Sequence, residues 1–237
     1  MCIEEKPHFY GRRQGRRLRK AKSVLMEKFL PKVKVDAEHP LAFPFKPQKI
    51  YLEIGFGDGD HLAGHSAKHT DIAYIGAEVF KNGIANLLSL ITGVKQNDEI
   101  SEDIKLLPSR NDNIRIWDDD IRLLFPLLPD ACIDRVFLLF PDPWPKNRHA
   151  SRRFINPQNL KILARILKPG GVLRVATDHV IYKTWTLRQL HESPDFRWTA
   201  SCDKDWKYAP TDWEPTKYQN KAIREGRRPV FLDFERK

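Results

Sequence analysis

Short apolar runs alternate with amphipathic segments from about residue 50 to the end of the chain. The apolar runs have the length and composition of buried strands and lie at 50–54, 72–78, 114–117, 133–140, 172–176 and 230–234. Segments with helical spacing of apolar residues lie between them, at 59–68, 82–91, 157–167 and 181–190. This alternation predicts a doubly wound, mostly parallel α/β sheet. No internal repeat and no second domain is visible, so we expect one domain over residues 23–237.

The first 22 residues lack this pattern. The sequence GRRQGRRLRKAK lies among them, with two glycines and almost no apolar side chain to pack. We therefore expect a basic, flexible arm over residues 1–22, which either contacts phosphates or serves only as a solubilising tail. A short amphipathic helix should follow at 23–30 and end at Pro31, and the polar stretch 93–112 should be a surface insertion.

The loop after the 133–140 run is the most informative part of the chain. It reads FPDPWPKNRHASRR, and its three prolines remove backbone donors and fix φ, which predicts a stiff, exposed loop at the carboxyl end of a strand. Ligands bind at that edge of an open α/β sheet. The loop carries one carboxylate, one indole and four cations: Asp142, Trp144, Lys146, Arg148, Arg152 and Arg153. An acid and an aromatic ring inside a cationic frame suit a nucleobase held by its phosphates, whereas the alternative is a plain connector with a solvated charge run.

Charge is spread unevenly along the chain. The net charge is +10, and residues 1–22 hold eight cations and two acids, among them Arg12, Arg13, Arg16 and Arg17. Residues 143–153 hold four cations and no acid, and residues 217–228 hold five cations and one acid. The remainder is therefore net acidic, and such local basicity indicates a polyanionic partner.

A glycine-rich loop follows the first apolar run, in the sequence LEIGFGDGD at 52–60. Gly55 and Gly57 let the backbone approach a ligand closely, but the third glycine comes one residue too early for a dinucleotide fingerprint. The acids of this loop, Glu53, Asp58 and Asp60, would repel a pyrophosphate and attract a cation. This disfavours a nicotinamide cofactor and favours S-adenosylmethionine, which carries a sulfonium and an ammonium group.

Two further strand ends carry acids. Glu78 ends the second apolar run, where an acid accepts hydrogen bonds from ribose hydroxyls. Asp118, Asp119 and Asp120 end the third, where a carboxylate can reach an adenine amino group; spacing favours Asp120, and Asp119 stays open.

Other site types find little support in the sequence. His61, His65 and His69 share a helical face, but no carboxylate or cysteine shares their stripe, so we expect no metal site. The three cysteines are far apart, which argues against disulfides and zinc. No apolar stretch is long enough to span a membrane and no signal-type segment follows the basic start, so we expect a cytoplasmic protein; its oligomeric state, monomer or homodimer, stays open.

The motifs together resemble those of the bacterial tRNA (guanine-N7-)-methyltransferases, which have the class I, Rossmann-like methyltransferase fold with seven strands. The resemblance rests on LEIGFGDG at 52–59, GAEVF at 76–80, LFPDPWPKNRH at 139–149, ATDH at 176–179 and TKYQ at 216–219. It implies transfer of a methyl group from S-adenosylmethionine to N7 of a guanosine in the variable loop of tRNA.

The resemblance also implies roles for individual residues. The cofactor would be bound by Glu53, Gly55, Gly57, Glu78, Asp120 and Asp142, and Asp142 would also be the catalytic residue. The substrate guanosine would be bound by Lys146, Asp178, Thr216, Lys217, Tyr218 and Gln219. The RNA backbone would be bound by Arg12, Arg13, Arg16, Arg17, Arg148, Arg152 and Arg153.

The chain departs from the family pattern at one site position. The last motif ends in Phe-Glu in the family and in Tyr218-Gln219 here, which puts a charged role for residue 219 in doubt. Two other hypotheses stay open: a methyltransferase of a small molecule or protein, and a non-catalytic RNA-binding protein on a methyltransferase scaffold.

Overall fold

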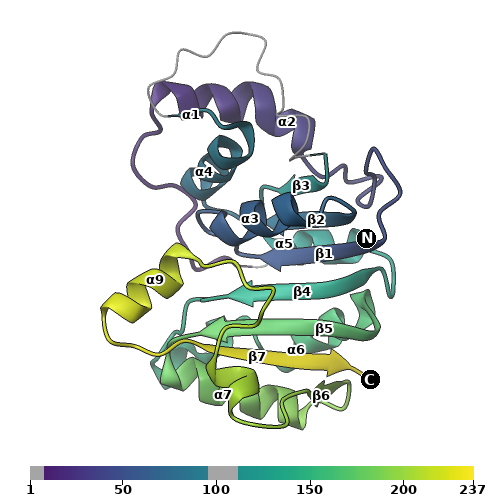
Figure 1. Cartoon of the computed structure of the whole chain (residues 1–237), viewed down its shortest axis with the longest axis vertical. Helices are drawn as coiled ribbons and strands as arrows, with labels where there is room; N and C mark the ends of the chain where they lie inside the picture. Colours follow the sequence, from purple (N-terminus) through teal and green to yellow (C-terminus); the bar gives the residue numbers. More distant parts are fainter. Residues whose placement is uncertain (1–7, 96–111) are drawn as a thin grey trace.

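The computed structural model describes residues 8–95 and 112–237, and in it seven strands form one sheet (Figure 1). Their order across the sheet is β3-β2-β1-β4-β5-β7-β6. The strands are β1 (Lys49–Ile54), β2 (Ile72–Ala77), β3 (Ile114–Trp117), β4 (Ile133–Leu139), β5 (Leu167–Thr177), β6 (Phe196–Trp198) and β7 (Val230–Arg236). The first five pair in parallel, and β7 is antiparallel to both β5 and β6. The expectation of a mostly parallel α/β sheet with seven strands is confirmed.

Helices cover both faces of this sheet. The regular helices after β1 are α3 (Asp60–Lys68), α4 (Lys81–Thr92), α5 (Ile121–Leu124), α6 (Pro157–Ile166), α7 (Val180–Glu192), α8 (Lys204–Lys207) and α9 (Lys217–Arg224). Two short 3-10 turns occur at Phe125–Leu127 and Asn147–Arg152. One apolar core joins α5, α6 and α7 to the sheet, and the other joins α3, α4 and the N-terminal helices to the opposite face. Neighbouring strand residues alternate between the cores: Leu52 belongs to the first and Tyr51 to the second.

The N-terminal helical run is longer than the sequence predicts. It comprises α1 (Lys20–Val24), a π-helical turn (Leu25–Phe29) and α2 (Leu30–Val33), so it does not end at Pro31. Pro31 lies in the first turn of α2, where a backbone N–H needs no partner within that helix. The Leu30 N–H bonds to the Leu25 carbonyl across the wide π turn just before the proline. The local change of helix type therefore admits the proline.

The sequence predicts six strands at nearly their observed positions but misses β6, α5, α8 and α9. β6 is only three residues long, α5 and α8 have four residues each, and α9 is polar along most of its length. Asn156 caps α6, because its Oδ1 accepts a hydrogen bond of 2.9 Å from the Asn159 N–H, and Pro157 follows at the first helical position. Most of the predicted insertion, residues 96–111, lies outside the described residues.

The chain direction sets the place of the functional site. Strand order reverses between β1 and β4, because β1 leads to β2 on one side and β4 leads to β5 on the other. A crevice is expected at the carboxyl ends of these strands, the side on which α9 lies in Figure 1. Within the described ranges, no helix is long and apolar enough to cross a membrane.

Candidate functional site

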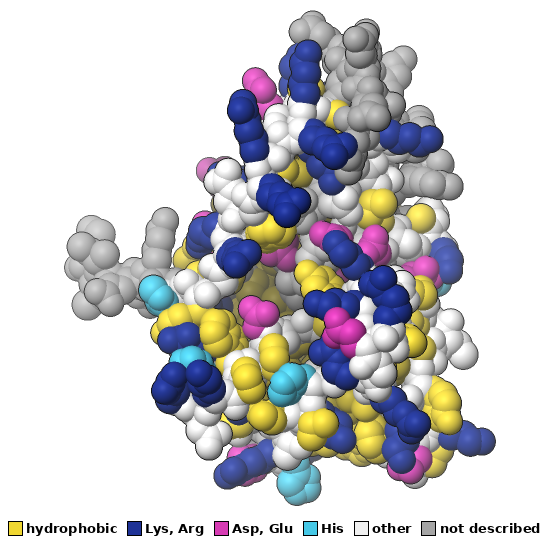
Figure 2. Space-filling view, turned by 90° about the vertical axis from the view of Figure 1, so that its left-hand side faces the viewer, with side chains coloured by type: hydrophobic (Ala, Val, Ile, Leu, Met, Phe, Trp, Pro, Cys, Tyr) yellow, Lys and Arg dark blue, Asp and Glu magenta, His cyan; other side chains and the backbone are white. Residues whose placement is uncertain are grey.

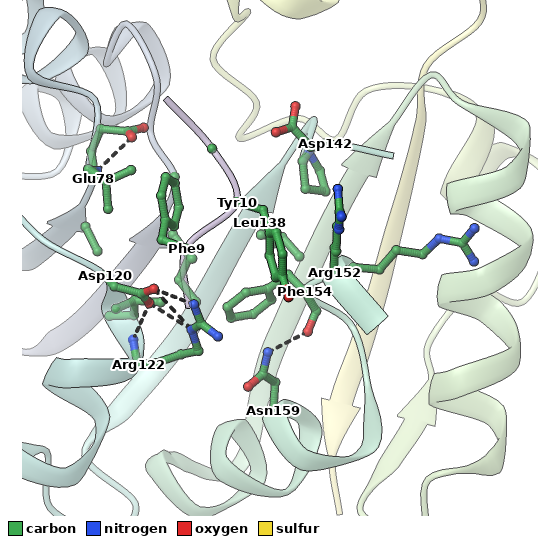
Figure 3. Close-up of a pocket in the computed structure, with 18 of the residues that line it drawn as sticks. Phe9, Tyr10, Glu78, Asp120, Arg122, Leu138, Asp142, Arg152, Phe154 and Asn159 are labelled. Carbon is green, nitrogen blue, oxygen red and sulfur yellow. Dashed lines mark hydrogen bonds and ion pairs between the residues drawn. The ribbon is translucent and has the colours of Figure 1, made fainter. Parts of the chain in front are cut away.

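A cavity of about 320 Å³ opens at the carboxyl ends of β1, β2, β3 and β4 (Figure 3). Its lining includes Gly55, Gly57, Glu78, Asp119, Asp120, Asp142, Trp144, Arg152 and Tyr218. These residues come from five separate segments of the chain. The fold thus brings most of the cofactor residues expected from the sequence to one place.

Glu78 is fixed at the end of β2 by backbone donors. Its Oε2 accepts a hydrogen bond of 2.7 Å from the Gly57 N–H, and its Oε1 accepts bonds of 2.8 and 2.9 Å from the N–H groups of Val79 and Phe80. Burial raises the pKa of Glu78, while these three donors act in the opposite direction. The positive φ of Gly57 (57°) permits the turn that brings its N–H to the carboxylate.

Glu53, expected from the sequence to contact the cofactor, is not among the residues that line this cavity. Its side chain is 3% exposed and accepts or shares a hydrogen bond of 2.8 Å with His61 Nδ1 on α3. The reason is strand alternation: Leu52 and Ile54 face the core beneath α5 and α6, so Glu53 faces the opposite side. The expectation that no carboxylate accompanies the histidine stripe was therefore wrong at His61. Across residues 8–95 and 112–237, no three potential ligands converge as a metal site would require.

The acids after β3 divide into two different roles. Asp120 caps α5 by accepting a bond of 3.0 Å from the Arg122 N–H, and the Arg122 guanidinium binds its carboxylate at 2.6 Å. Asp119 pairs with Arg13 at 2.7 Å. Both aspartates line the cavity, and Asp120 is the more deeply buried, with 5% exposed.

The loop after β4 holds two non-glycine residues in the left-handed region, Phe140 (φ 50°) and Trp144 (φ 41°). Such a backbone needs external support. Arg153 supplies it, because its guanidinium donates to the Trp144 carbonyl at 2.9 Å and stacks on the Trp185 ring. Asp142, between the two strained positions, is exposed at the cavity mouth.

Arg153 is consequently not a contact for RNA phosphates, contrary to the sequence expectation. Its side chain is 3% exposed, so no phosphate oxygen reaches it. Arg148 and Lys146 on the same loop are exposed. Arg152 lies between two aromatic rings, with its guanidinium 4.4 Å from the Tyr10 centroid and 4.9 Å from that of Trp144.

The 216–219 segment forms the first turn of α9. Thr216 Oγ1 caps the helix by accepting a bond of 3.0 Å from the Gln219 N–H, and Lys217 Nζ binds Asp58 in the glycine loop at 2.5 Å. Tyr218 lies against Gly57, where an added Cβ would come within 2.9 Å of the Tyr218 ring. The side-chain oxygen of Gln219 accepts a bond of 2.6 Å from the Trp213 indole N–H. The family departure at residue 219 therefore retains an acceptor oxygen at this place.

Asp178 lies after β5 and is already paired. Its carboxylate binds the Arg227 guanidinium at 3.0 Å, and Arg227 also pairs with Glu225. Arg227 belongs to the basic segment 217–228, and no motif in the sequence marks it as the partner of Asp178.

The described part of the basic arm, residues 8–22, lies on the domain and has partners, contrary to the expectation that it has nothing to pack against. The Lys81 N–H donates to the Arg13 carbonyl at 3.0 Å, and the Asn82 amide bonds to the backbone of Gly15 and Arg16 at 2.8 Å each. Residues 8–11 line the cavity. The two aromatic residues Phe9 and Tyr10 are the feature of the sequence that indicates packing of this segment against the domain, within an otherwise basic composition.

Cations surround the cavity on this face of the molecule. Figure 2 shows Lys and Arg side chains around a hollow that has apolar side chains in its depth. The exposed cations of the three basic segments include Arg12, Arg16, Arg17, Lys146, Arg148, Lys217, Lys221 and Arg224. Such a cationic rim attracts a polyanion, while Glu78 and Asp120 are buried in the lining of the cavity.

The sequence matches a known family over most of its length. A family model described as "Putative methyltransferase" covers residues 47–232. The tRNA (guanine-N(7)-)-methyltransferase of Rhodospirillum rubrum is 42% identical over 99% of this chain and 91% of the relative. That of Paramagnetospirillum magneticum is 43% identical over 98% of this chain and 94% of the relative.

This chain belongs to the tRNA (guanine-N7-)-methyltransferase family. Among solved structures, the antibiotic-resistance methyltransferase Kmr superimposes with a TM-score of 0.51 at 17% identity, over 80% of this chain and 87% of that one. The fibrillarin/Nop5p complex gives a TM-score of 0.50 at 12% identity, over 81% and 75%. These likenesses establish the class I methyltransferase fold that the strand order shows.

Proposed function

We propose that this protein transfers a methyl group from S-adenosylmethionine to N7 of a guanosine in the variable loop of tRNA. The observation that carries the proposal is the position of Asp142. Its carboxylate is exposed at the mouth of a cavity that Glu78 and Asp120 line and that Lys and Arg side chains surround. Family membership supports the same reaction. Because tRNA is a cytoplasmic polyanion, we also propose that the enzyme works in the cytoplasm.

The residues of the cavity fit S-adenosylmethionine. The buried Glu78 carboxylate lines the cavity and suits ribose hydroxyls, and Asp120 suits the adenine amino group. Gly57 carries its N–H to Glu78, and a Cβ there would clash with Tyr218, so the loop has room only for glycine. Glu53 would act on the cofactor indirectly, because its hydrogen bond to His61 fixes α3, the helix that follows the glycine loop.

When bound, the cofactor supplies a methyl group on a positively charged sulfur. Guanine N7 has a free lone pair and no proton to lose, so the protein needs no strong general base. Asp142 instead offsets the positive charge that develops on the guanine ring and orients the base. Trp144 forms part of the pocket wall beside it.

The guanosine would be held by groups that converge on the cavity mouth. Lys146 is exposed on the loop that carries Asp142. The Asp178 carboxylate, which is paired with Arg227, would accept a hydrogen bond from an N–H group of the guanine in place of that ion pair. Thr216, Lys217, Tyr218 and Gln219 bring the first turn of α9 onto the glycine loop. Exposed Arg12, Arg16, Arg17, Arg148 and half-buried Arg152 are the proposed backbone contacts, with Arg13 engaged by Asp119 until RNA competes for it.

The test is label transfer from S-adenosylmethionine with a tritiated methyl group to an unmodified tRNA transcript. Label in RNA is expected. Bound but unlabelled tRNA would favour a non-catalytic RNA-binding scaffold, and label only in added small molecules or proteins would favour the other substrate classes.

Asp142→Asn removes the charge and keeps the shape. We expect turnover to fall about 100-fold, as for loss of one preorganised electrostatic group, with tRNA and cofactor affinity nearly unchanged. Single-turnover label transfer measures the effect. Full turnover in this variant, with normal binding, would exclude Asp142 as the catalytic residue.

A further inference from the structure

The N-terminal segment enters the cavity that the proposed cofactor would occupy. Residues 8–11 contribute to the same lining as Glu78 and Asp120. In Figure 3, the Phe9 ring lies between these two acids and Leu138. Tyr10 follows on the same segment and is the more exposed of the two aromatic residues, with 47% of its surface exposed. The segment is therefore part of the pocket and not only an RNA-binding extension.

Specific contacts hold the segment on both sides of Phe9. The Arg122 guanidinium that binds Asp120 also donates to the His8 carbonyl at 3.0 Å. On the other side, Arg13 pairs with Asp119 at 2.7 Å, and its guanidinium lies 5.4 Å from the Phe9 ring centroid. Both aspartates after β3 thus anchor the segment while they line the cavity.

Tyr10 connects the segment to the loop that carries Asp142. Its ring meets the Trp144 ring edge to face with centroids 6.3 Å apart, and the Arg152 guanidinium stacks on both rings. A single stretch of chain therefore touches the acids after β3 and the catalytic loop after β4.

We propose that Phe9 and Tyr10 are cofactor-binding residues that form the outer wall of the adenosine pocket. Glu78 and Asp120 supply the polar contacts of that pocket, but a planar purine also needs an apolar or aromatic surface. Phe9 is the aromatic side chain that lies beside both acids. This inference rests on the proposed function, since it takes S-adenosylmethionine as the occupant.

The wall has a consequence for the coupling of the two substrates. Arg12, Arg16 and Arg17 follow directly on the same segment and are exposed. A phosphate backbone bound to them restrains the segment over the cavity. Because such coupling is reciprocal, bound tRNA tightens cofactor binding by the same factor by which the cofactor tightens tRNA binding.

The test compares the full-length protein with Phe9→Ala and Tyr10→Ala by isothermal titration with S-adenosylmethionine and S-adenosylhomocysteine. Phe9→Ala should raise both dissociation constants about tenfold, and Tyr10→Ala should raise them less. The control is Tyr208→Ala, because Tyr208 is an aromatic residue, 68% exposed against 47% for Tyr10, that does not line the cavity. Phe9→Leu should restore most of the affinity, since it keeps an apolar surface.

Two results would overturn the inference, and both differ from failure of the proposed function. Unchanged affinity in Phe9→Ala and Tyr10→Ala would mean that the segment contacts no cofactor. Tighter binding in Phe9→Ala would mean that the ring blocks the pocket instead of forming its wall. If the wild-type protein binds neither compound, the proposed function itself is contradicted, together with the role of Phe9 and Tyr10.

Discussion

Single residues on one loop have opposite roles although their side chains are alike. Arg148 is exposed, whereas Arg153 is buried with its guanidinium bonded to the Trp144 carbonyl. The sequence RHASRR does not distinguish them, because both belong to one basic run. The difference arises from the strained backbone at Phe140 and Trp144, which needs a buried donor.

Alanine substitutions separate the two roles. Arg153→Ala should lower the free energy of unfolding by about 3 kcal/mol, because it leaves buried carbonyls without a donor. Arg148→Ala should leave stability within about 0.5 kcal/mol but weaken tRNA binding and reduce its salt slope by about 1. Urea unfolding and filter binding at several salt concentrations measure these effects. Equal stability losses in the two variants would contradict the assignment.

Elements that meet at the cavity come from distant parts of the sequence, and α9 is the least expected of them. Its first turn brings Lys217 to Asp58 and Tyr218 to Gly57. The Thr216 cap fixes where this turn begins. The position of α9 therefore links the glycine loop to the side of the cavity proposed to bind guanosine.

The cap predicts a local effect. Thr216→Ala should destabilise the start of α9 by about 1 kcal/mol, equivalent to roughly fivefold faster amide hydrogen exchange in that helix. The KM for tRNA should rise with little change in the KM for S-adenosylmethionine. Thr216→Ser keeps the hydroxyl and should restore both values. Exchange in α9 that is as slow with alanine as with threonine would show that the cap does not hold the helix.

An element could be predicted from the sequence when its own residues carry the signal for it. β4 ends in the buried apolar run Val136–Leu139, and α6 begins with its own cap, Asn156, so both are visible in short windows of sequence. α9 has almost no buried residue except Ala222, and its position depends on an ion pair with Asp58, 159 residues away. Its helical form was therefore not visible in the sequence.

The same distinction applies to the site. The spacing of the acids at the strand ends predicted that they lie together. Glu53 faces the α3 side of the sheet instead, because its neighbours on β1 fill the core on the opposite face. Phe9 and Tyr10 were missed because only the folded chain brings residues 8–11 to the ends of β2 and β3.

At the scale of the whole molecule, a buried histidine couples stability to pH. His65 lies on the buried face of α3 and is 2% exposed, and its Nδ1 lies 2.7 Å from the Tyr74 hydroxyl. Burial, together with His61 and His69 nearby, lowers the pKa of His65 to about 3. In the unfolded chain this side chain binds a proton below its ordinary pKa of 6.5, whereas the native state does not.

Stability should therefore fall as the pH decreases through this range. The His65 contribution amounts to a loss of about 2 kcal/mol between pH 7 and pH 5. His65→Asn should remove that part of the pH dependence, while the exposed-surface control His191→Gln should keep the wild-type slope. Urea unfolding at several pH values gives the slopes, and an unchanged slope in His65→Asn would contradict a neutral buried His65.

The basic rim suits a polyanion, and the carboxylates that line the cavity suit a cationic cofactor. The proposed reaction gives 7-methylguanosine in tRNA. Nucleoside mass spectrometry of an unmodified tRNA transcript, after incubation with the purified protein and S-adenosylmethionine, tests it most directly. The account predicts one new nucleoside, 7-methylguanosine. A guanosine methylated at another position, another methylated nucleoside, or an unchanged transcript would contradict it.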